Sequence, residues 1–156
     1  MSENKLSQCE MVRGSTMETR EVISLLVELA REMEDVVGEK GAVSIFRHAG
    51  KQVGKRLGKE HGNGAEEDAR SVALSFFHAK GFMDSITLDG HEAEIQGCKI
   101  GLVLQEEGLK PGSHPLCHFG FGLIDGSIKA VTDEKVNTKH QSSVYHAEGI
   151  TCRETW

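Results

Sequence analysis

The residues with the clearest capacity for chemistry are cysteines and histidines in the C-terminal half of the chain. The sequence has 156 residues and four cysteines, and Cys98, Cys117 and Cys152 all lie in that half. Cys117 stands beside His118 in the stretch SHPLCHFGFG, and His146 and Cys152 share the stretch YHAEGITC. A metal site, a reactive thiol, a haem contact and inert core thiols are all compatible with these residue types.

Cys117 is expected in the first turn of a helix. Ser113 is a suitable N-cap residue, and Pro115 fits a first helical turn. Unpaired backbone N–H groups and the helix dipole at such an end stabilise a thiolate, which favours ligation or reactivity over an inert thiol. Cys98 immediately precedes a shorter expected helix, in a similar setting. His118 points about 100° away round the helix, and we expect a hydrogen-bonded residue there rather than a ligand.

Three cysteines and one histidine, Cys98, Cys117, His146 and Cys152, make a set typical of a closed structural zinc site. His146 and Cys152 flank a turn between two expected strands, and in the simplest register their Cβ atoms lie ~5 Å apart. His140 shares a strand face with His146 and is the natural substitute ligand. An iron–sulfur cluster accepts the same donors, and inert core thiols or a redox or catalytic thiol remain alternatives. No CxxCH motif for covalent haem is present, and no feature favours non-covalent haem.

Helices are expected in the N-terminal half, after a tail at residues 1–17. Apolar residues recur at helical spacing from Glu18, and Gly38 is a plausible stop. Two further helices are expected at about 41–61 and 65–80.

The second of these helices carries Gly50, Gly54 and Gly58 on one face. Glycine inside a helix costs ~1 kcal/mol relative to alanine, so we expect another backbone to approach this face closely. The lysines in GKQVGKRLGKE form a neighbouring row, which is interpreted as a solvated basic face. The stretch lacks the GxxxxGK[ST] pattern of a phosphate-binding loop.

The hydrophobic period changes to two near residue 84. DSITL and HEAEI predict a β-hairpin with its turn at Asp89-Gly90, and two more strands are expected at about 136–145 and 150–156. The order is helices, hairpin, helices, hairpin. It predicts an α+β fold with N-terminal helices packed on an antiparallel sheet, formed by one domain at residues 18–156.

Composition narrows the function classes. The formal charge of −6 argues against a general nucleic-acid binder. No apolar run approaches the ~18–20 residues of a membrane span, and the start of the chain lacks the apolar segment of a signal peptide, so a cytoplasmic protein is expected. A disulfide framework is not expected in that compartment.

Four stretches of the sequence resemble, in order, the 4-vinyl reductase or hydrocarbon-binding domain family. They are GEKGAVSIFRHAGKQVGKRLGKE, FHAKGFM, PLCHFGFGLIDGSIKAV and YHAEGITC. The resemblance covers about residues 20–156 and rests on the glycine-spaced helix, the Cys-His-Phe helix start and the closing turn.

The resemblance implies a dimeric small-molecule sensing module, with a fold similar to that of certain vesicle-trafficking transport-complex subunits. Several members bind zinc through C-terminal cysteines in a motif E-x-x-C-x-x-x-G-D-x-x-C. This chain departs from that motif, because Gly149 has no following Asp and no Cys lies near position 145. Ser142 and Ser143 stand where the glutamate is expected, so a zinc site cannot simply be carried over.

The leading hypothesis is a homodimeric sensor or carrier for a small apolar molecule, with a C-terminal metal site that organises its pocket and an output through another protein. Aromatic residues that could line the pocket, or equally serve as core, are Phe76, Phe77, Phe82, Phe119 and Phe121. The alternatives are a metal- or thiol-dependent enzyme of hydrolase or reductase type, and a structural partner subunit by analogy of fold.

Overall fold

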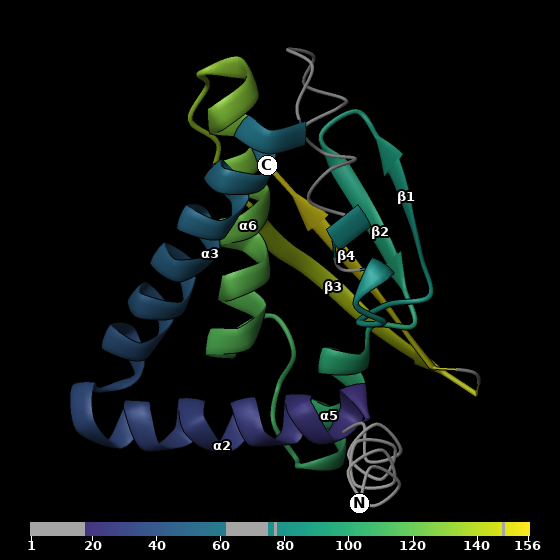
Figure 1. The fold of residues 1–156 in the computed structure, drawn as a ribbon. Helices are drawn as coiled ribbons and strands as arrows, with labels where there is room; N and C mark the ends of the chain where they lie inside the picture. Colours follow the sequence, from purple (N-terminus) through teal and green to yellow (C-terminus); the bar gives the residue numbers. More distant parts are fainter. Residues whose placement is uncertain (1–17, 62–74, 77, 148) are drawn as a thin grey trace, which may run out of the picture.

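The computed structural model describes residues 18–61, 75–76, 78–147 and 149–156. Its elements, in chain order, are α2 (Thr19–Val37), α3 (Glu39–His61), β1 (Ser85–Asp89), β2 (Glu92–Gln96), α5 (Lys99–Glu106), α6 (Pro115–Thr132), β3 (Lys139–His146) and β4 (Gly149–Thr155). The predicted tail at 1–17 and most of the predicted helix at 65–80 lie outside the described residues. Helices and strands otherwise occur in the predicted order (Figure 1).

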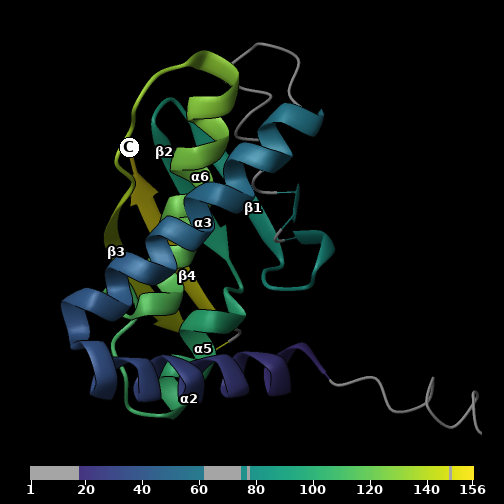
Figure 2. The same cartoon turned by 60° about the vertical axis from the view of Figure 1, so that its left-hand side comes forward.

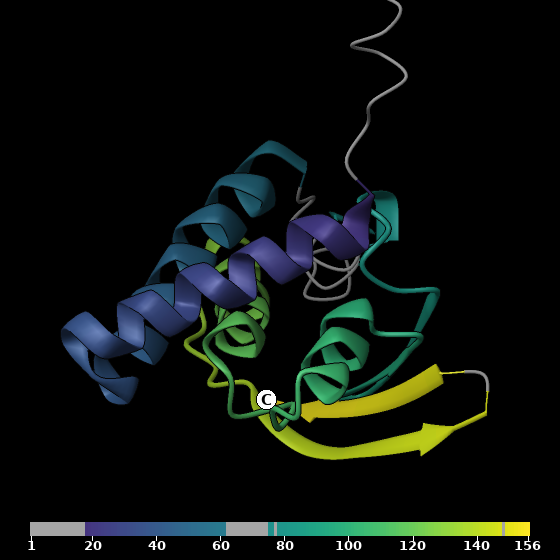
Figure 3. The same ribbon diagram turned by 90° about the horizontal axis from the view of Figure 1, so that it is seen from below.

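The sheet is antiparallel, with strand order β1-β2-β4-β3. The predicted first hairpin is confirmed as β1 and β2, in which Ile86 lies opposite Ile95 and Leu88 opposite Ala93. Its turn lies one residue later than predicted, since Asp89 still pairs with Glu92. Seen from below, α2, α3 and α6 lie on the same side of the β3–β4 hairpin (Figure 3). The α+β fold class predicted from the sequence is confirmed.

Helix α2 begins and ends where its sequence predicts. Glu18 and Glu21 form a reciprocal capping box at its start, and Gly38 ends it with a φ of 78°. Its inner residues Ile23 and Val27 are fully buried against Val103 and Leu104 of α5. A second cluster of apolar residues joins α6 to the sheet, and its buried members are Met83, Ile95, Leu123, Ile124, Ile128, Ile150 and Cys152.

Helices α3 and α6 cross with their backbones in contact (Figure 2). A Cβ atom at Gly50 would lie 2.0 Å from the carbonyl oxygen of Phe119, and one at Gly54 would lie 2.2 Å from that of Leu123. The contact is reciprocal, because a Cβ atom at Gly122 would lie 2.1 Å from the carbonyl oxygen of Arg47. The predicted close approach at the glycine row is therefore confirmed, and α6 is the partner.

A buried carboxylate fixes the start of β3 to this helix pair. Asp125 of α6 accepts hydrogen bonds from the backbone N–H and hydroxyl of Thr138, at 2.8 and 2.7 Å. Arg47 of α3 donates to Asp125 and to the carbonyl oxygen of Thr138, both at 2.8 Å. These bonds tie the residue that precedes β3, the edge strand of the sheet, to both α3 and α6. Among the helices described, none is both long enough and apolar enough to cross a membrane.

Candidate ligand site: a thiol-lined cavity

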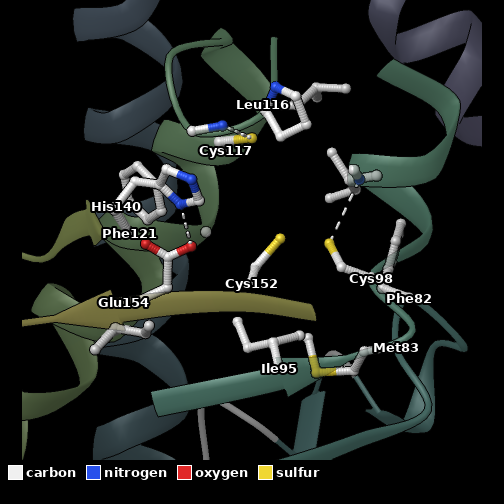
Figure 4. A pocket seen from close by; sticks show the side chains of 16 residues that line it. Phe82, Met83, Ile95, Cys98, Leu116, Cys117, Phe121, His140, Cys152 and Glu154 are labelled. Carbon is white, nitrogen blue, oxygen red and sulfur yellow. Dashed lines mark hydrogen bonds and ion pairs between the residues drawn. The ribbon is translucent and has the colours of Figure 1, made fainter. Parts of the chain in front are cut away.

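A small cavity lies between α5, α6 and the inner face of the sheet (Figure 4). Its volume is about 60 Å³. Most of its wall is apolar, and three thiols and one His–Glu pair supply its chemistry. The side chains used below are Phe82, Cys98, Leu116, Cys117, Phe121, His140, Cys152 and Glu154. We call this space the thiol cavity.

Cys117 enters the thiol cavity from the first turn of α6. Pro115 occupies the start of that helix, as predicted, but His114 is the N-cap residue and its Nδ1 atom accepts a hydrogen bond from the backbone N–H of Leu116. The prediction that Ser113 caps the helix is therefore wrong. The sulfur of Cys117 accepts a hydrogen bond from the Gly112 N–H at 3.3 Å. Burial nevertheless raises the pKa of Cys117 to about 12, which outweighs the predicted stabilisation of a thiolate by the helix end.

Cys98 and Cys152 line the other side of the cavity (Figure 4). Cys98 is the N-cap residue of α5, and its sulfur accepts from the Gly101 N–H at 3.5 Å. The hydrogen bond with Cys98 lowers the pKa of Cys152 to about 7, and the same bond, with burial, raises the pKa of Cys98. Cys98 thus remains the thiol, and Cys152 is the more acidic partner.

His140 and Glu154 face each other across β3 and β4 at the rim of the same cavity. Their Nδ1 and Oε1 atoms are 2.9 Å apart. Hydrogen bonding to Glu154 raises the pKa of His140, whereas burial raises the pKa of Glu154. The second carboxylate oxygen of Glu154, Oε2, is buried without a hydrogen-bond partner. Gly112 makes room for the pair, because a Cβ atom there would lie 2.1 Å from the His140 ring.

A β-bulge decides which histidine reaches the thiols. His140 pairs with Glu154 and Ser143 pairs with Cys152, with a register shift between them. The extra residue on β3 moves the inward-facing positions by one, so His140 and Ser143 face inward. His146 lies opposite Gly149 and is exposed, with its Nε2 atom 3.0 Å from the Thr151 hydroxyl. The expectation that His146 and Cys152 pair across the hairpin is wrong.

The structure thus brings three of the four predicted metal ligands, Cys98, Cys117 and Cys152, to one cavity and leaves His146 outside it. Within the described residues, no group of three or more His, Cys, Asp and Glu side chains is arranged to hold a metal ion. Each of the three sulfurs is hydrogen-bonded to protein groups instead. Zinc stays a prediction, and the arrangement of the donors as they stand does not fit it.

The predicted aromatic residues divide between two spaces. Phe82 and Phe121 line the thiol cavity. Phe76, Phe82 and Phe119 line a larger apolar pocket of about 380 Å³ among α2, α3 and α6. Phe77 lies outside the described residues. Phe82, Ile100 and Leu116 belong to both linings, so these side chains form a common wall.

Sequence reasoning missed Glu154 altogether and placed His140 only as a substitute ligand. The alternation of Ile150, Cys152 and Glu154 along one strand was the available signal, because it places Glu154 on the buried face with the cysteine. An acidic residue on an inward-facing strand position is uncommon and marks a site.

No family model matches this sequence, and no curated protein matches it. Among solved structures, the chain is similar to the phenol-responsive sensory domain of the transcription activator PoxR, crystallised with phenol. The likeness covers 85% of this chain and 74% of that chain, with a TM-score of 0.61 and 16% sequence identity. The chain therefore shares its fold with a sensory domain.

Proposed function

We propose that this domain is a sensor for a small, largely apolar molecule that carries one hydrogen-bond donor. The observation that carries the proposal is that Glu154 lines a mostly apolar cavity while its buried Oε2 atom lacks a hydrogen-bond partner. Leaving such a group unpaired costs about 1–3 kcal/mol, and a ligand hydroxyl would remove that cost. Phenol, an aromatic ring with one hydroxyl, is the molecule to which the PoxR sensory domain responds.

The size of the cavity supports coupling between binding and a change of shape. A cavity of about 150 Å³ accommodates benzene, and the thiol cavity has about 60 Å³. A benzene-sized ligand therefore needs space from the apolar pocket beyond Phe82, Ile100 and Leu116. Moving this wall would alter the contacts of α5 and of the start of α6. A ligand that prefers the opened wall would shift the population towards that state.

We propose that helix α2 transmits the movement of the common wall to other proteins. It packs on α5, and it exposes Leu25, Leu29 and Val36. Ile45 of α3 is also exposed near the apolar pocket that Leu26 and Met33 of α2 line. A second copy of the chain covering this face is the proposed dimer, and a downstream protein would read its geometry.

Calorimetric titration of the reduced protein with phenol and with toluene tests the hydrogen-bond role of Glu154. We expect phenol to bind about 10- to 100-fold more tightly than toluene, since hydrogen bonds to charged groups contribute about 1.5–3 kcal/mol. Glu154→Leu should bring the two affinities together. Glu92→Leu, which removes an exposed carboxylate from the neighbouring strand, should leave the preference intact.

Two results would contradict the proposal. One is that neither compound binds at millimolar concentration. The other is a preference for phenol that survives in Glu154→Leu.

A further inference from the structure

Cys98 and Cys152 are adjacent, and Gly101 borders both sulfurs. Its N–H lies 3.5 Å from the sulfur of Cys98, and a Cβ atom at Gly101 would lie 3.7 Å from that of Cys152. The two thiols also influence each other's pKa, because hydrogen bonding between them lowers the pKa of Cys152 and raises that of Cys98. Cys117, by contrast, is bonded to Gly112 and projects from α6 on the other side of the cavity (Figure 4). Of the cysteines described, these two are placed to react together.

A chain of hydrogen bonds leads from Cys152 to a buried carboxylate. The sulfur lies 3.5 Å from the Ser143 hydroxyl, which lies 3.0 Å from Nε2 of His140. Nδ1 of His140 lies 2.9 Å from Glu154. Since Nδ1–H of the neutral ring donates a hydrogen bond to the carboxylate, Nε2 accepts one from the Ser143 hydroxyl, and the Ser143 oxygen can accept one from the thiol. A nucleophile, a base and a third group that orients the base are the parts of an activated nucleophile.

We propose that Cys98 and Cys152 are a redox-active dithiol that hydrogen peroxide converts to a disulfide. The Cys152 sulfur attacks one peroxide oxygen and the O–O bond breaks. Cys152 becomes a sulfenic acid, and the other oxygen leaves as water with the thiol proton, carried through Ser143 and His140. The Cys98 sulfur then attacks the Cys152 sulfur, and the hydroxyl leaves as water with the Cys98 proton. Two thiols are oxidised and one peroxide is reduced to two waters.

The cavity favours a small oxidant. Its volume of about 60 Å³ admits a molecule of the size of water or hydrogen peroxide. Cys152 is 4% exposed, which restricts direct attack by a bulky disulfide. The product would join β4 to the N-cap position of α5. It would cross-link the sheet to the helix whose Ile100 forms part of the common wall.

The experiment exposes folded, metal-free protein to hydrogen peroxide in a Cys9→Ser background, so that the remaining cysteine of the sequence does not contribute. Peptide mapping without reduction should find Cys98 joined to Cys152. Cys117→Ala is the matched control, since it removes a thiol of the same cavity and should leave the cross-link unchanged. Cys98→Ala should stop the reaction at a Cys152 sulfenic acid that dimedone traps. Ser143→Ala should slow the oxidation of Cys152 by at least about tenfold.

A cross-link that includes Cys117, or intact Cys98 and Cys152 thiols after peroxide treatment of the folded protein, would overturn the inference. An unchanged oxidation rate in a Ser143→Ala variant whose circular dichroism spectrum is also unchanged would show that the hydrogen-bond chain does not activate Cys152. That result would overturn the inference as stated. Disulfide formation needs no ligand, so its failure leaves phenol binding untouched. Phenol titration is done on reduced protein and reports only on the proposed function.

Discussion

Helix α6 has two faces that are packed in different ways. On one face, Gly122 and Gly126 meet the backbone of α3, and a single added methyl group would lie 2.1 or 2.2 Å from a carbonyl oxygen. On the other face, Cys117, Phe121 and Ile124 border a cavity. Close packing makes the first face intolerant of added volume, whereas an unfilled space leaves the second face room for it.

This difference suggests a division of labour within one helix. The glycine face fixes the position of α6 against α3, and the Asp125–Arg47 bonds fix the start of β3 against both. Most of the cavity face is thereby held at a constant place, so that a change in the occupant of the cavity has to be taken up by the common wall, at α5 and the first turn of α6, rather than by the rest of α6.

The largest expected effect is that of a methyl group on the glycine face. Gly54→Ala would place its Cβ atom 2.2 Å from the Leu123 carbonyl oxygen, and backbone atoms cannot yield as a side chain does. We expect a loss of at least about 3 kcal/mol in the free energy of unfolding, measured by urea denaturation, with Tm lower by about 6–12 °C.

Gly41→Ala in the same helix is the matched control. Its nearest neighbours are atoms of the Val37 side chain at 3.0 Å, and the higher helix propensity of alanine offsets this contact by ~1 kcal/mol. Equal losses in the two variants would show that the α3–α6 contact is not special.

The two faces also differ in how well the sequence predicts them. The spacing of Gly50, Gly54 and Gly58 repeats with the helix period, so the close contact follows from local sequence alone. The same holds for the start of α2 next to Glu18 and its end at Gly38.

The cavity face depends on long-range geometry. The convergence of Cys98, Cys117 and Cys152 in one space agrees with their predicted grouping, but the choice of histidine was wrong by strand register. The bulge between His140 and Ser142 leaves no signal in the alternation of residue types. It places His140 on the face opposite to His146, whereas simple alternation predicts that both histidines share a face, so the buried His140–Glu154 pair was not predicted.

A substitution on the cavity face should have an intermediate effect. Cys117→Val adds about one methyl group where the helix borders the thiol cavity. We expect the free energy of unfolding to change by less than about 1.5 kcal/mol, while phenol affinity falls at least about tenfold because the space is filled. Denaturation and calorimetry give both values. A destabilisation as large as that of Gly54→Ala would abolish the contrast between the faces.

The smallest expected effect is a pH-dependent loss of folding stability at the N-terminal end of α6, which His114 caps. Burial first, and the positive charge of Arg31 second, lower the pKa of His114 from 6.5 to about 4. The unfolded chain therefore binds this proton at a higher pH than the folded protein does. The stabilising contribution is complete above pH 6.5 and is lost as the pH falls towards 4. In addition, a protonated Nδ1 atom cannot accept the hydrogen bond from the Leu116 N–H that caps the helix.

The free energy of unfolding of the protein and of His114→Asn should be measured by denaturation at several pH values from 7 to 4. Because the same carboxyl groups titrate in both proteins, the difference between the two pH profiles reports the contribution of His114. Asparagine provides a cap acceptor that does not titrate. The difference in free energy of unfolding between the two proteins should therefore change by about 1 kcal/mol between pH 7 and pH 4. Ser113→Ala should keep the parent pH profile and change stability by less than about 0.5 kcal/mol, because Ser113 does not cap the helix. Parallel curves for the parent and His114→Asn would mean that the cap does not depend on the neutral imidazole. The cap of α6 would then contribute to stability independently of pH, as the contacts of the glycine face do.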